Sequence, residues 1–183
     1  MKPVKVGLLG LGTVGGGTAV ILKRNAEEIA RRAGRGIEID FIATLDPDAA
    51  ASLGVANIRQ TDDAYKVVND PEIDIVVELI GGYSPAKELV LQAIENGKHV
   101  VTANKALIAM HGDEIFAKAQ EKGVVVAFEA AIAGGIPIIK ALREGLAANR
   151  IEWLAGIING TGNFILTEMR DKGRSFDDVL AEA

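Results

Sequence analysis

Two kinds of hydrophobic pattern alternate along the chain. Short apolar runs, which predict buried strands, lie at residues 6–9, 37–44, 73–80, 99–102 and 124–128. Apolar residues at helical spacing, which predict helices, cover residues 14–33, 62–68, 84–97 and 105–121. Only short loops separate these segments, and Asp46-Pro47-Asp48 has the composition of a turn. The alternation predicts an α/β fold, a doubly wound parallel sheet of the Rossmann type.

The pattern changes near residue 130. Small residues are followed by Pro137 at the start of a predicted helix to about residue 146, then a predicted strand at 151–158 and predicted helices at 164–169 and 176–183. This second region has about fifty residues, too few to bury a core of its own. We therefore expect a dinucleotide-binding domain at 1–130 and, at 131–183, the beginning of an α+β substrate and dimerisation domain that continues beyond Ala183.

The first loop carries the most informative motif. Gly10, Gly12 and Gly15 follow the first strand at G-x-G-x-x-G spacing, and a helix follows directly. In this arrangement one glycine makes the turn, the next bares the backbone under a diphosphate, and the third lets helix and strand pack closely. Glycine is 21 of 183 residues, so an ordinary glycine-rich turn is the alternative. The position between the first strand and a helix favours dinucleotide binding.

Two later loops are candidate cofactor contacts because ligands of open α/β sheets bind beyond the carboxyl ends of the strands. Asp46 follows the second strand, where a carboxylate can accept a hydrogen bond from a ribose hydroxyl; an ordinary turn aspartate is the alternative. Gly81 and Gly82 follow the strand at 73–80, where bare backbone allows a ribose or nicotinamide to approach. A simple turn at the end of the strand is the alternative there.

The segment Thr102-Ala103-Asn104-Lys105 connects a strand to a helix. Asn104 is expected to cap that helix, which places Lys105 in the first turn. The positive end of the helix dipole disfavours a cation there by about 0.3 to 1 kcal/mol. Lys105 is therefore a candidate for contact with a ligand, and Thr102 is a candidate cofactor contact beside it.

Glu129 precedes a loop of small residues that includes Ile132, Gly134 and Ile136. One carboxylate with free carbonyl groups suits a hard monovalent cation better than calcium. A buried, hydrogen-bonded Glu129 is the alternative reading of the same spacing. His99 and His111 have the positions of structural residues, at the start of a strand and within a helix.

The composition of the chain indicates which kinds of molecule it binds. The formal net charge is −5, and lysine and arginine are dispersed, which argues against nucleic acid and anionic membranes and favours a small-molecule ligand. The chain has no cysteine, as expected for the reducing cytoplasm. Its opening residues lack a signal-peptide cleavage site, and no apolar run reaches the roughly 18 residues of a membrane span.

Several longer blocks carry a family resemblance. GLGTVG, DIVVELIGG, GKHVVTANKALIA, FEAAIAGGIPII and NGTGNFIL, in this order and at these distances, resemble the N-terminal half of homoserine dehydrogenase. The resemblance covers essentially the whole chain. It implies an NAD(P)-dependent interconversion of L-homoserine and L-aspartate 4-semialdehyde, on the route to threonine, methionine and isoleucine.

The same resemblance implies roles for particular residues. Leu11, Gly12, Thr13 and Val14 would contact the dinucleotide, and Lys105 would lie between the nicotinamide and the substrate. A sodium ion would be held by the Glu129 carboxylate and the carbonyl groups of Ile132, Gly134 and Ile136. Residues 159–161 would approach the nicotinamide from the substrate domain, through which the family also pairs into dimers.

The chain departs from the family pattern in two ways. Many relatives carry arginine just before the acidic residue after the second strand, where this chain has Thr44 and Leu45. Without that guanidinium partner for a 2′-phosphate, we expect weaker discrimination in favour of NADP, or a preference for NAD. The family's substrate-binding acids and second catalytic lysine lie further along than Ala183. The 183 residues are therefore expected to bind cofactor and to turn over poorly or not at all.

Two other functions remain open at this stage. Another semialdehyde or imine reductase can share the glycine loop and a lysine after a strand. A non-catalytic module that senses dinucleotides can share the glycine loop alone, but it has no reason to keep VTANKAL together with EAAIAGGIPI.

Overall fold

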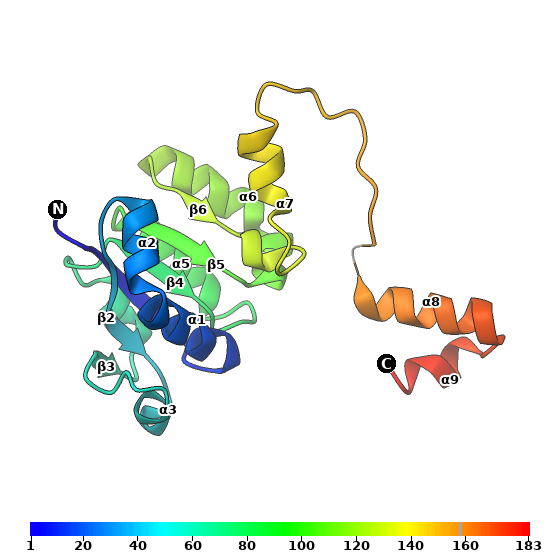
Figure 1. Cartoon of the computed structure of the whole chain (residues 1–183), viewed down its shortest axis with the longest axis horizontal. Coiled ribbons are helices and arrows are strands. Elements are labelled where there is room, and N and C mark those ends of the chain that lie inside the picture. The colour runs from blue at the N-terminus through cyan, green and yellow to red at the C-terminus, as the bar shows by residue number, and fades with distance from the viewer. Residues whose placement is uncertain (158) are drawn as a thin grey trace. The chain divides into compact units, whose positions relative to one another are not determined.

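The computed structural model describes residues 1–157 and 159–183, and the chain divides into two compact units, Met1–Ala141 and Leu142–Ala183. Strands and helices alternate through the first unit (Figure 1). Its strands are β1 (Val4–Leu9), β2 (Ile37–Ala43), β3 (Arg59–Thr61), β4 (Ile75–Glu78), β5 (His99–Thr102) and β6 (Val126–Ala127). Its helices are α1 (Thr13–Arg24), α2 (Ala26–Ala33), α3 (Pro47–Ser52), α4 (Ala64–Val68), α5 (Ala86–Glu95), α6 (Lys105–Lys122), the 3-10 turn η1 (Glu129–Ala131) and α7 (Ile138–Lys140).

The six strands form one sheet in the order β3-β2-β1-β4-β5-β6, and every neighbouring pair is parallel. From β1 the chain first adds β2 and β3 on one side, then returns to add β4, β5 and β6 on the other. The direction of winding therefore reverses between β1 and β4, and such a point opens a crevice beyond the carboxyl ends of the strands. The predicted doubly wound parallel sheet is confirmed.

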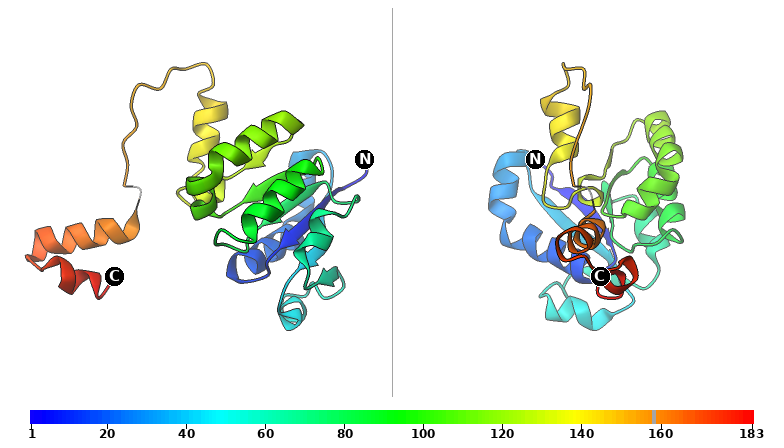
Figure 2. Two further views of the ribbon diagram at one scale, coloured as in Figure 1. Left: turned by 180° about the vertical axis from the view of Figure 1, so that it is seen from behind. Right: turned by 90° about the vertical axis from the view of Figure 1, so that its right-hand side faces the viewer.

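Helices cover both faces of this sheet (Figure 2). On one face, α4, α5 and α6 bury a cluster that includes Val68, Leu89 and Ile115 against the strands. On the other, α1 and α3 bury a second cluster that includes Ala19 and Ala50. Because the centre of the sheet is covered on both faces, β4 (IVVE) reads as a nearly continuous apolar run rather than an alternating one.

Three local expectations for the first unit were wrong. The helix predicted at 14–33 is two helices, because Asn25 leaves the helical conformation (φ −105°, ψ 18°) between α1 and α2. The expected turn at 46–48 instead starts α3, with Asp46 as its cap. Strand β3 was not predicted because Arg59–Thr61, with sequence RQT, contains no apolar residue.

The second region also departs from expectation. The helix predicted at 137–146 is the short α7 followed by a π-helix, η2 (Ala141–Gly145). Residues 151–157 of the predicted strand have no regular structure, and Ile158 lies outside the described residues. A strand needs a neighbour for its backbone groups, and the described part of the second unit offers helices: α8 (Gly160–Lys172) and α9 (Phe176–Leu180). Among the described helices, none has the length and apolar character to cross a bilayer.

Candidate functional site

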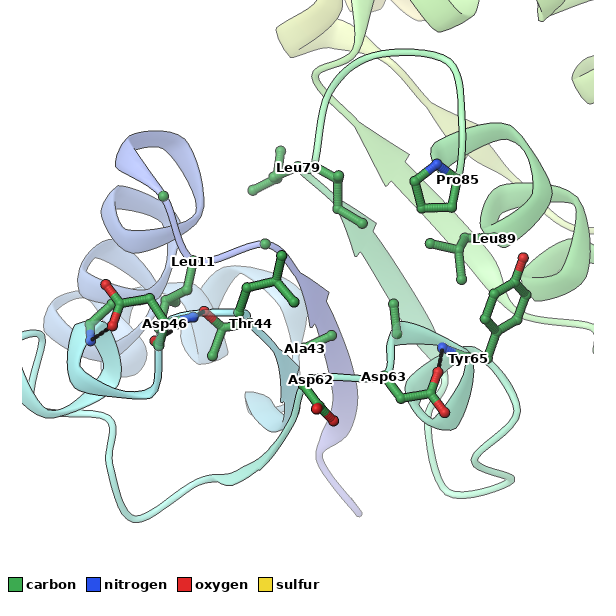
Figure 3. A pocket seen from close by; sticks show the side chains of 16 residues that line it. Leu11, Ala43, Thr44, Asp46, Asp62, Asp63, Tyr65, Leu79, Pro85 and Leu89 are labelled. Atoms are coloured by element: carbon green, nitrogen blue, oxygen red, sulfur yellow. Dashed lines mark hydrogen bonds between the residues drawn. The ribbon is translucent and has the colours of Figure 1, made fainter.

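A cleft of about 590 Å³ opens at the carboxyl edge of the sheet, where the winding direction reverses (Figure 3). Its walls come from four loops that are far apart in the sequence. They are residues 10–12 after β1, 43–46 after β2, 62–65 after β3 and 79–80 after β4, with Ala49, Pro85 and Leu89 completing the lining. Three of these side chains, Asp46, Asp62 and Asp63, are carboxylates, and none of the lining residues is lysine or arginine.

The three glycines of the glycine loop differ in the space that surrounds them. Gly10 has φ +92°, and a Cβ there would lie 2.9 Å from the Leu79 carbonyl oxygen. At Gly15 a Cβ would lie 2.0 Å from the Gly10 carbonyl oxygen, so the helix can approach the turn only without a side chain. At Gly12 a Cβ would meet nothing within 4 Å. Gly10 and Gly15 thus lie where the turn and the close packing require glycine, and the approach of a diphosphate to Gly12 stays a prediction.

The N-terminus of α1 points its backbone donors at this loop. Gly12 is the N-cap and provides no side-chain cap, and the first turn contains no acidic residue. The first N–H groups of a helix have no partner within the helix, and together with the helix dipole they attract an anion. Around this turn, Leu11 is buried, whereas Gly12, Thr13 and Val14 are exposed. The N-terminus of α1 therefore has the chemistry of an anion-binding site.

Asp46 is both a cap and a possible ligand contact. Its Oδ1 accepts hydrogen bonds from the backbone N–H groups of Asp48 (3.0 Å) and Ala49 (3.3 Å), which starts α3. Among the described residues no donor to Oδ2 is seen, and the side chain lines the cleft. Figure 3 places Asp46 near Leu11, at the side of the cleft bounded by α1. The capping role of Asp46 is therefore observed, and its contact with a ribose hydroxyl stays a prediction.

A hydrogen-bonded cluster joins the ends of β4 and β5. Glu78 is fully buried, and its carboxylate accepts hydrogen bonds from the backbone N–H groups of Ile80 (2.9 Å) and Gly81 (3.2 Å). Its other oxygen accepts from the Thr102 hydroxyl at 2.6 Å. Thr102 is also fully buried. The hydrogen bond to Glu78 is the contact that this structure shows for Thr102, and its contact with a cofactor stays a prediction.

Sequence reasoning missed Glu78 as a site residue. In the run IDIVVELI it reads as a polar interruption of a buried strand. A carboxylate inside a two-sided parallel sheet must find donors, and that requirement was the available signal. Tyr65, which lines the cleft beside Leu89 and Pro85, was also missed because an isolated aromatic residue on a short helix has no distinctive spacing.

Lys105 lies at the first position of α6 and is exposed. As expected, Asn104 caps the helix, with its Oδ1 accepting from the Leu107 N–H at 3.0 Å. Within the described residues Lys105 has no ion pair, whereas lysines 5, 87, 118 and 122 each pair with a carboxylate. Gly81, whose φ is +82°, follows the neighbouring strand β4. Lys105 and Gly81 therefore lie on adjacent loops of the same sheet edge.

Glu129 is half-buried, and its carboxylate binds the start of α7. It accepts hydrogen bonds from the backbone N–H groups of Ile139 (2.9 Å) and Lys140 (2.8 Å). The carbonyl oxygen of Ile136 accepts from the Ile138 N–H at 2.8 Å. The hydrogen-bonded reading of Glu129 is thus satisfied. Among the described residues, no group of three or more histidine, cysteine, aspartate and glutamate side chains has the arrangement of a metal site.

At the opposite, amino edge of the sheet, a buried lysine has a structural role. Lys98 is 4% exposed, and its ammonium group donates to the carbonyl oxygens of Asp70 (2.6 Å) and Ile73 (2.9 Å). Burial lowers the pKa of Lys98 below its ordinary value. The bonds it makes hold the turn before β4.

In the second unit, Asn159 caps α8 by accepting a hydrogen bond from the Gly162 N–H at 2.6 Å. Asn159, Gly160 and Thr161 are exposed. The expectation that they approach a nicotinamide depends on the placement of this unit and stays a prediction.

Comparison with known proteins agrees with these features. Residues 10–129 match the family described as "Homoserine dehydrogenase, NAD binding domain", and residues 137–183 match the family described as "Homoserine dehydrogenase". A curated homoserine dehydrogenase from Pseudomonas aeruginosa is 74% identical over the whole chain, which spans 42% of that relative.

Solved structures give the same result. A homoserine dehydrogenase from Thiobacillus denitrificans is 70% identical with a TM-score of 0.89, and the match covers 100% of this chain and 42% of that one. A hyperthermophilic archaeal homoserine dehydrogenase in complex with NADPH is 27% identical with a TM-score of 0.76, over 100% of this chain and 60% of that one. Both family matches and the shared fold lead to one conclusion: the chain belongs to the homoserine dehydrogenase family.

Proposed function

We propose that the protein containing these residues interconverts L-homoserine and L-aspartate 4-semialdehyde with NAD(P) as cofactor, in the biosynthesis of threonine, methionine and isoleucine. In this proposal residues 1–130 form the dinucleotide-binding domain and residues 131–183 begin the substrate domain. The observation that carries the proposal is the glycine loop, which presents uncapped helix N–H groups beside a cleft at the reversal of the sheet. Membership of the family supplies the reaction.

The cleft has the chemistry that a dinucleotide requires. The diphosphate would bind the first N–H groups of α1, where Gly12 leaves open space. The adenosine would occupy the cleft between the loops after β2 and β3, with a ribose hydroxyl donating to Asp46. The nicotinamide would then lie towards Gly81 and Lys105, which follow β4 and β5.

The reaction divides between cofactor and protein. The nicotinamide ring supplies or accepts a hydride at the aldehyde carbon of the substrate. Lys105 would direct its ammonium group at the aldehyde oxygen, stabilise the negative charge that develops there and donate a proton to it. In the reverse direction the same amine would accept the hydroxyl proton. The absence of an ion pair in the described residues leaves this ammonium group available for the task.

Selectivity between NAD and NADP would come from the loop after β2. Thr44 and Leu45 stand where a guanidinium group would hold a 2′-phosphate, and Leu45 is 89% exposed. The carboxylates of Asp46, Asp62 and Asp63 add negative charge to the same cleft. Because like charges repel a phosphate that has no cationic partner, we infer a preference for NAD.

A sodium site is a further part of the proposal. Glu129 provides one carboxylate, and Ile132, Gly134 and Ile136 would provide carbonyl groups, a set of hard oxygen ligands suited to a monovalent ion. The hydrogen bonds from Ile139 and Lys140 leave lone pairs on both carboxylate oxygens. A thermal-unfolding titration tests the site: sodium should raise the Tm of the full-length protein more than choline does. Equal effects of the two salts, or an unchanged sodium effect in E129Q, would exclude it.

The second region is expected to pair copies of the protein into a homodimer in the cytoplasm. The apolar side chains of the second region are between 47% and 80% exposed, and further protein surface would cover them: Ile151, Trp153, Leu154 and Ile157. Light scattering on the full-length protein tests this expectation, and a monomer at micromolar concentration would contradict it.

The decisive test of function is an assay on the full-length protein. NADH and NADPH oxidation should be followed with L-aspartate 4-semialdehyde as substrate, and an imine and a second semialdehyde should serve as competing candidates. We expect turnover with L-aspartate 4-semialdehyde and a higher kcat/KM with NADH. Turnover with another substrate alone would identify a different reductase, and cofactor binding without any turnover would indicate a sensing module.

A further inference from the structure

The buried carboxylate of Glu78 belongs to a closed ring of hydrogen bonds at the nicotinamide end of the proposed site. Glu78 is the last residue of β4, and it is fully buried. Burying a carboxylate is costly unless donors surround it. The question is therefore what the groups that donate hydrogen bonds to Glu78 do for the site.

One side of the ring holds the loop after β4. The Oε1 atom of Glu78 accepts from the N–H groups of Ile80 (2.9 Å) and Gly81 (3.2 Å). Gly81 and Gly82 have φ values of +82° and +71°, and an added Cβ at either would meet nothing within 4 Å. The loop therefore takes a left-handed course through open space, and the carboxylate fixes its beginning.

The other side of the ring holds the start of α6. The Oε2 atom of Glu78 accepts from the Thr102 hydroxyl (2.6 Å), whose oxygen accepts from the Asn104 N–H (3.0 Å). The Asn104 amide group donates to the Gly82 carbonyl oxygen at 2.6 Å, which closes the ring. The other end of that amide caps α6 at Leu107. The Glu78 carboxylate and the Asn104 amide group thus both connect the loop after β4 to the start of α6.

The ring of hydrogen bonds lies between Lys105 and the loop after β4, which both belong to the proposed site. Lys105 follows Asn104 directly, so the position of its backbone is set by the capped end of α6. The loop after β4 lies against the glycine loop, since a Cβ on Gly10 would be 2.9 Å from the Leu79 carbonyl oxygen. A shift of Glu78 would therefore displace Lys105 and the loop after β4, which packs against the glycine loop.

We propose that Glu78 is a positioning residue, which acts through Thr102 and Asn104 to hold Lys105 and the Gly81–Gly82 loop in register at the nicotinamide end. The inference rests on the proposed function for its reaction and on the hydrogen bonds for its geometry. A role in folding alone would predict lower stability with normal chemistry in the protein that folds. A positioning role predicts that loss of the ring weakens binding of the nicotinamide part of the cofactor alone. A role in folding alone predicts no such difference between NADH and ADP-ribose.

The test uses the full-length enzyme and two substitutions of Thr102. T102V keeps the shape and removes the hydroxyl, and T102S keeps the hydroxyl. T61V is the control, because the Thr61 hydroxyl accepts the Asp63 N–H at 3.1 Å in the same strand-end arrangement outside the ring. Each variant is measured for kcat, for Tm, and for the dissociation constants of NADH and of ADP-ribose, which lacks the nicotinamide.

We expect T102V to lower kcat at least about tenfold, since small displacements of reacting groups cost rates of this order. NADH affinity should fall and ADP-ribose affinity should stay unchanged. T102S should restore kcat to near the wild-type value, and T61V should leave it unchanged. Loss of Tm in T102V with normal kcat, or equal loss of affinity for both ligands, would overturn the proposal.

A double-mutant cycle tests the connection to Lys105. If the ring acts through this lysine, adding T102V to K105A should cost less in kcat than T102V costs alone. NADH affinity is measured for the same four proteins. It gives the coupling between the two residues if turnover by K105A is too slow to measure. Fully additive effects on both quantities would overturn the coupling. An inactive wild-type enzyme would instead refute the proposed reaction. The affinities for NADH and ADP-ribose would still test whether the ring of hydrogen bonds positions the nicotinamide end of the site.

Discussion

Single carboxylates at strand ends serve two purposes in this protein. Asp46 caps α3 through Oδ1, and its side chain also lines the cleft. Glu78 satisfies two backbone donors with one oxygen and a hydroxyl with the other. Because a carboxylate has about four acceptor positions, one residue can maintain local structure and still contribute to a site.

Replacement of Lys105 tests the chemistry at the residue scale. In the full-length enzyme, K105A should lower kcat by about 10²- to 10⁴-fold, the range typical of a positioned acid or base. Its KM for the dinucleotide should change little, because the diphosphate and adenosine contacts remain. Steady-state kinetics in both directions measure these effects, and an unchanged kcat would remove Lys105 from the mechanism.

Cofactor preference can be tested by restoring the missing guanidinium group. Leu45 is almost fully exposed, so L45R can be introduced without disturbing the core. The variant should bind NADPH about tenfold or more tightly relative to NADH, since a charge-assisted hydrogen bond is worth about 1.5 to 3 kcal/mol. L45Q is the uncharged control. Calorimetric titration measures both ratios, and equal gains in L45R and L45Q would argue against the charge explanation.

Spacing explains which site residues could be predicted. The fixed pattern identified Gly10 and Gly15, where a Cβ would lie 2.9 Å and 2.0 Å from a carbonyl oxygen, whereas at Gly12 a Cβ would meet nothing within 4 Å. Thr102 was predicted as a cofactor contact, and the sequence did not show that its hydroxyl donates a hydrogen bond to the buried Glu78 carboxylate. The direction of one side chain at a strand end depends on the partner available in the folded protein, and sequence spacing does not contain that information.

At the scale of elements, the order of strands and helices was predictable because buried parallel strands are apolar throughout. The errors arose where local and tertiary preferences differ. Asp46-Pro47-Asp48 suits a turn and also the first turn of a helix, and the chain uses it for α3. Strand β3 forms on three residues without an apolar side chain because β2 is available to pair with it.

Acid stability should reflect an ion-pair cluster between α5 and α6. Glu95 binds Lys118 at 2.8 Å and Lys122 at 2.5 Å, and these hydrogen bonds lower its pKa to about 2. A carboxyl group with a lowered pKa stabilises the fold above its ordinary pKa and loses that contribution as pH falls towards the lowered value. E95Q should therefore have a slightly lower Tm than the wild type at pH 6.

The difference should shrink as the pH is lowered from about 4.5, where the free carboxyl group titrates, towards pH 2. It should also shrink at high salt, because the groups are exposed. Thermal unfolding between pH 2 and 7 measures it. A constant difference across that range would show that the ion pairs are not its source.

At the scale of the whole molecule, one edge of the sheet gathers residues from five distant parts of the chain. The loops after β1, β2, β3, β4 and β5 all end there because parallel strands share a direction. Cofactor binding should therefore require only residues 1–183, which contain these loops, whereas turnover should require the remainder of the enzyme. The chain spans 42% of the relative from Pseudomonas aeruginosa.

A polypeptide of residues 1–183 tests this division. It should bind NADH with an affinity close to that of the full-length protein and show no measurable turnover of L-aspartate 4-semialdehyde. Fluorescence titration and the NADH oxidation assay measure the two properties. G15A is the matched control for binding, because its Cβ would lie 2.0 Å from the Gly10 carbonyl oxygen. Turnover by the 183 residues would contradict the division.

The direction of β1 also has a practical consequence. Met1 is fully exposed just before Val4, at the sheet edge opposite the cleft, and the six residues of β1 span about 20 Å at roughly 3.3 Å per residue. A sensor chip or fluorescent label tethered at this end would leave the entrance to the cleft facing the bulk solution. Surface-based kinetics with free nucleotides should then report the same rates as measurements in solution.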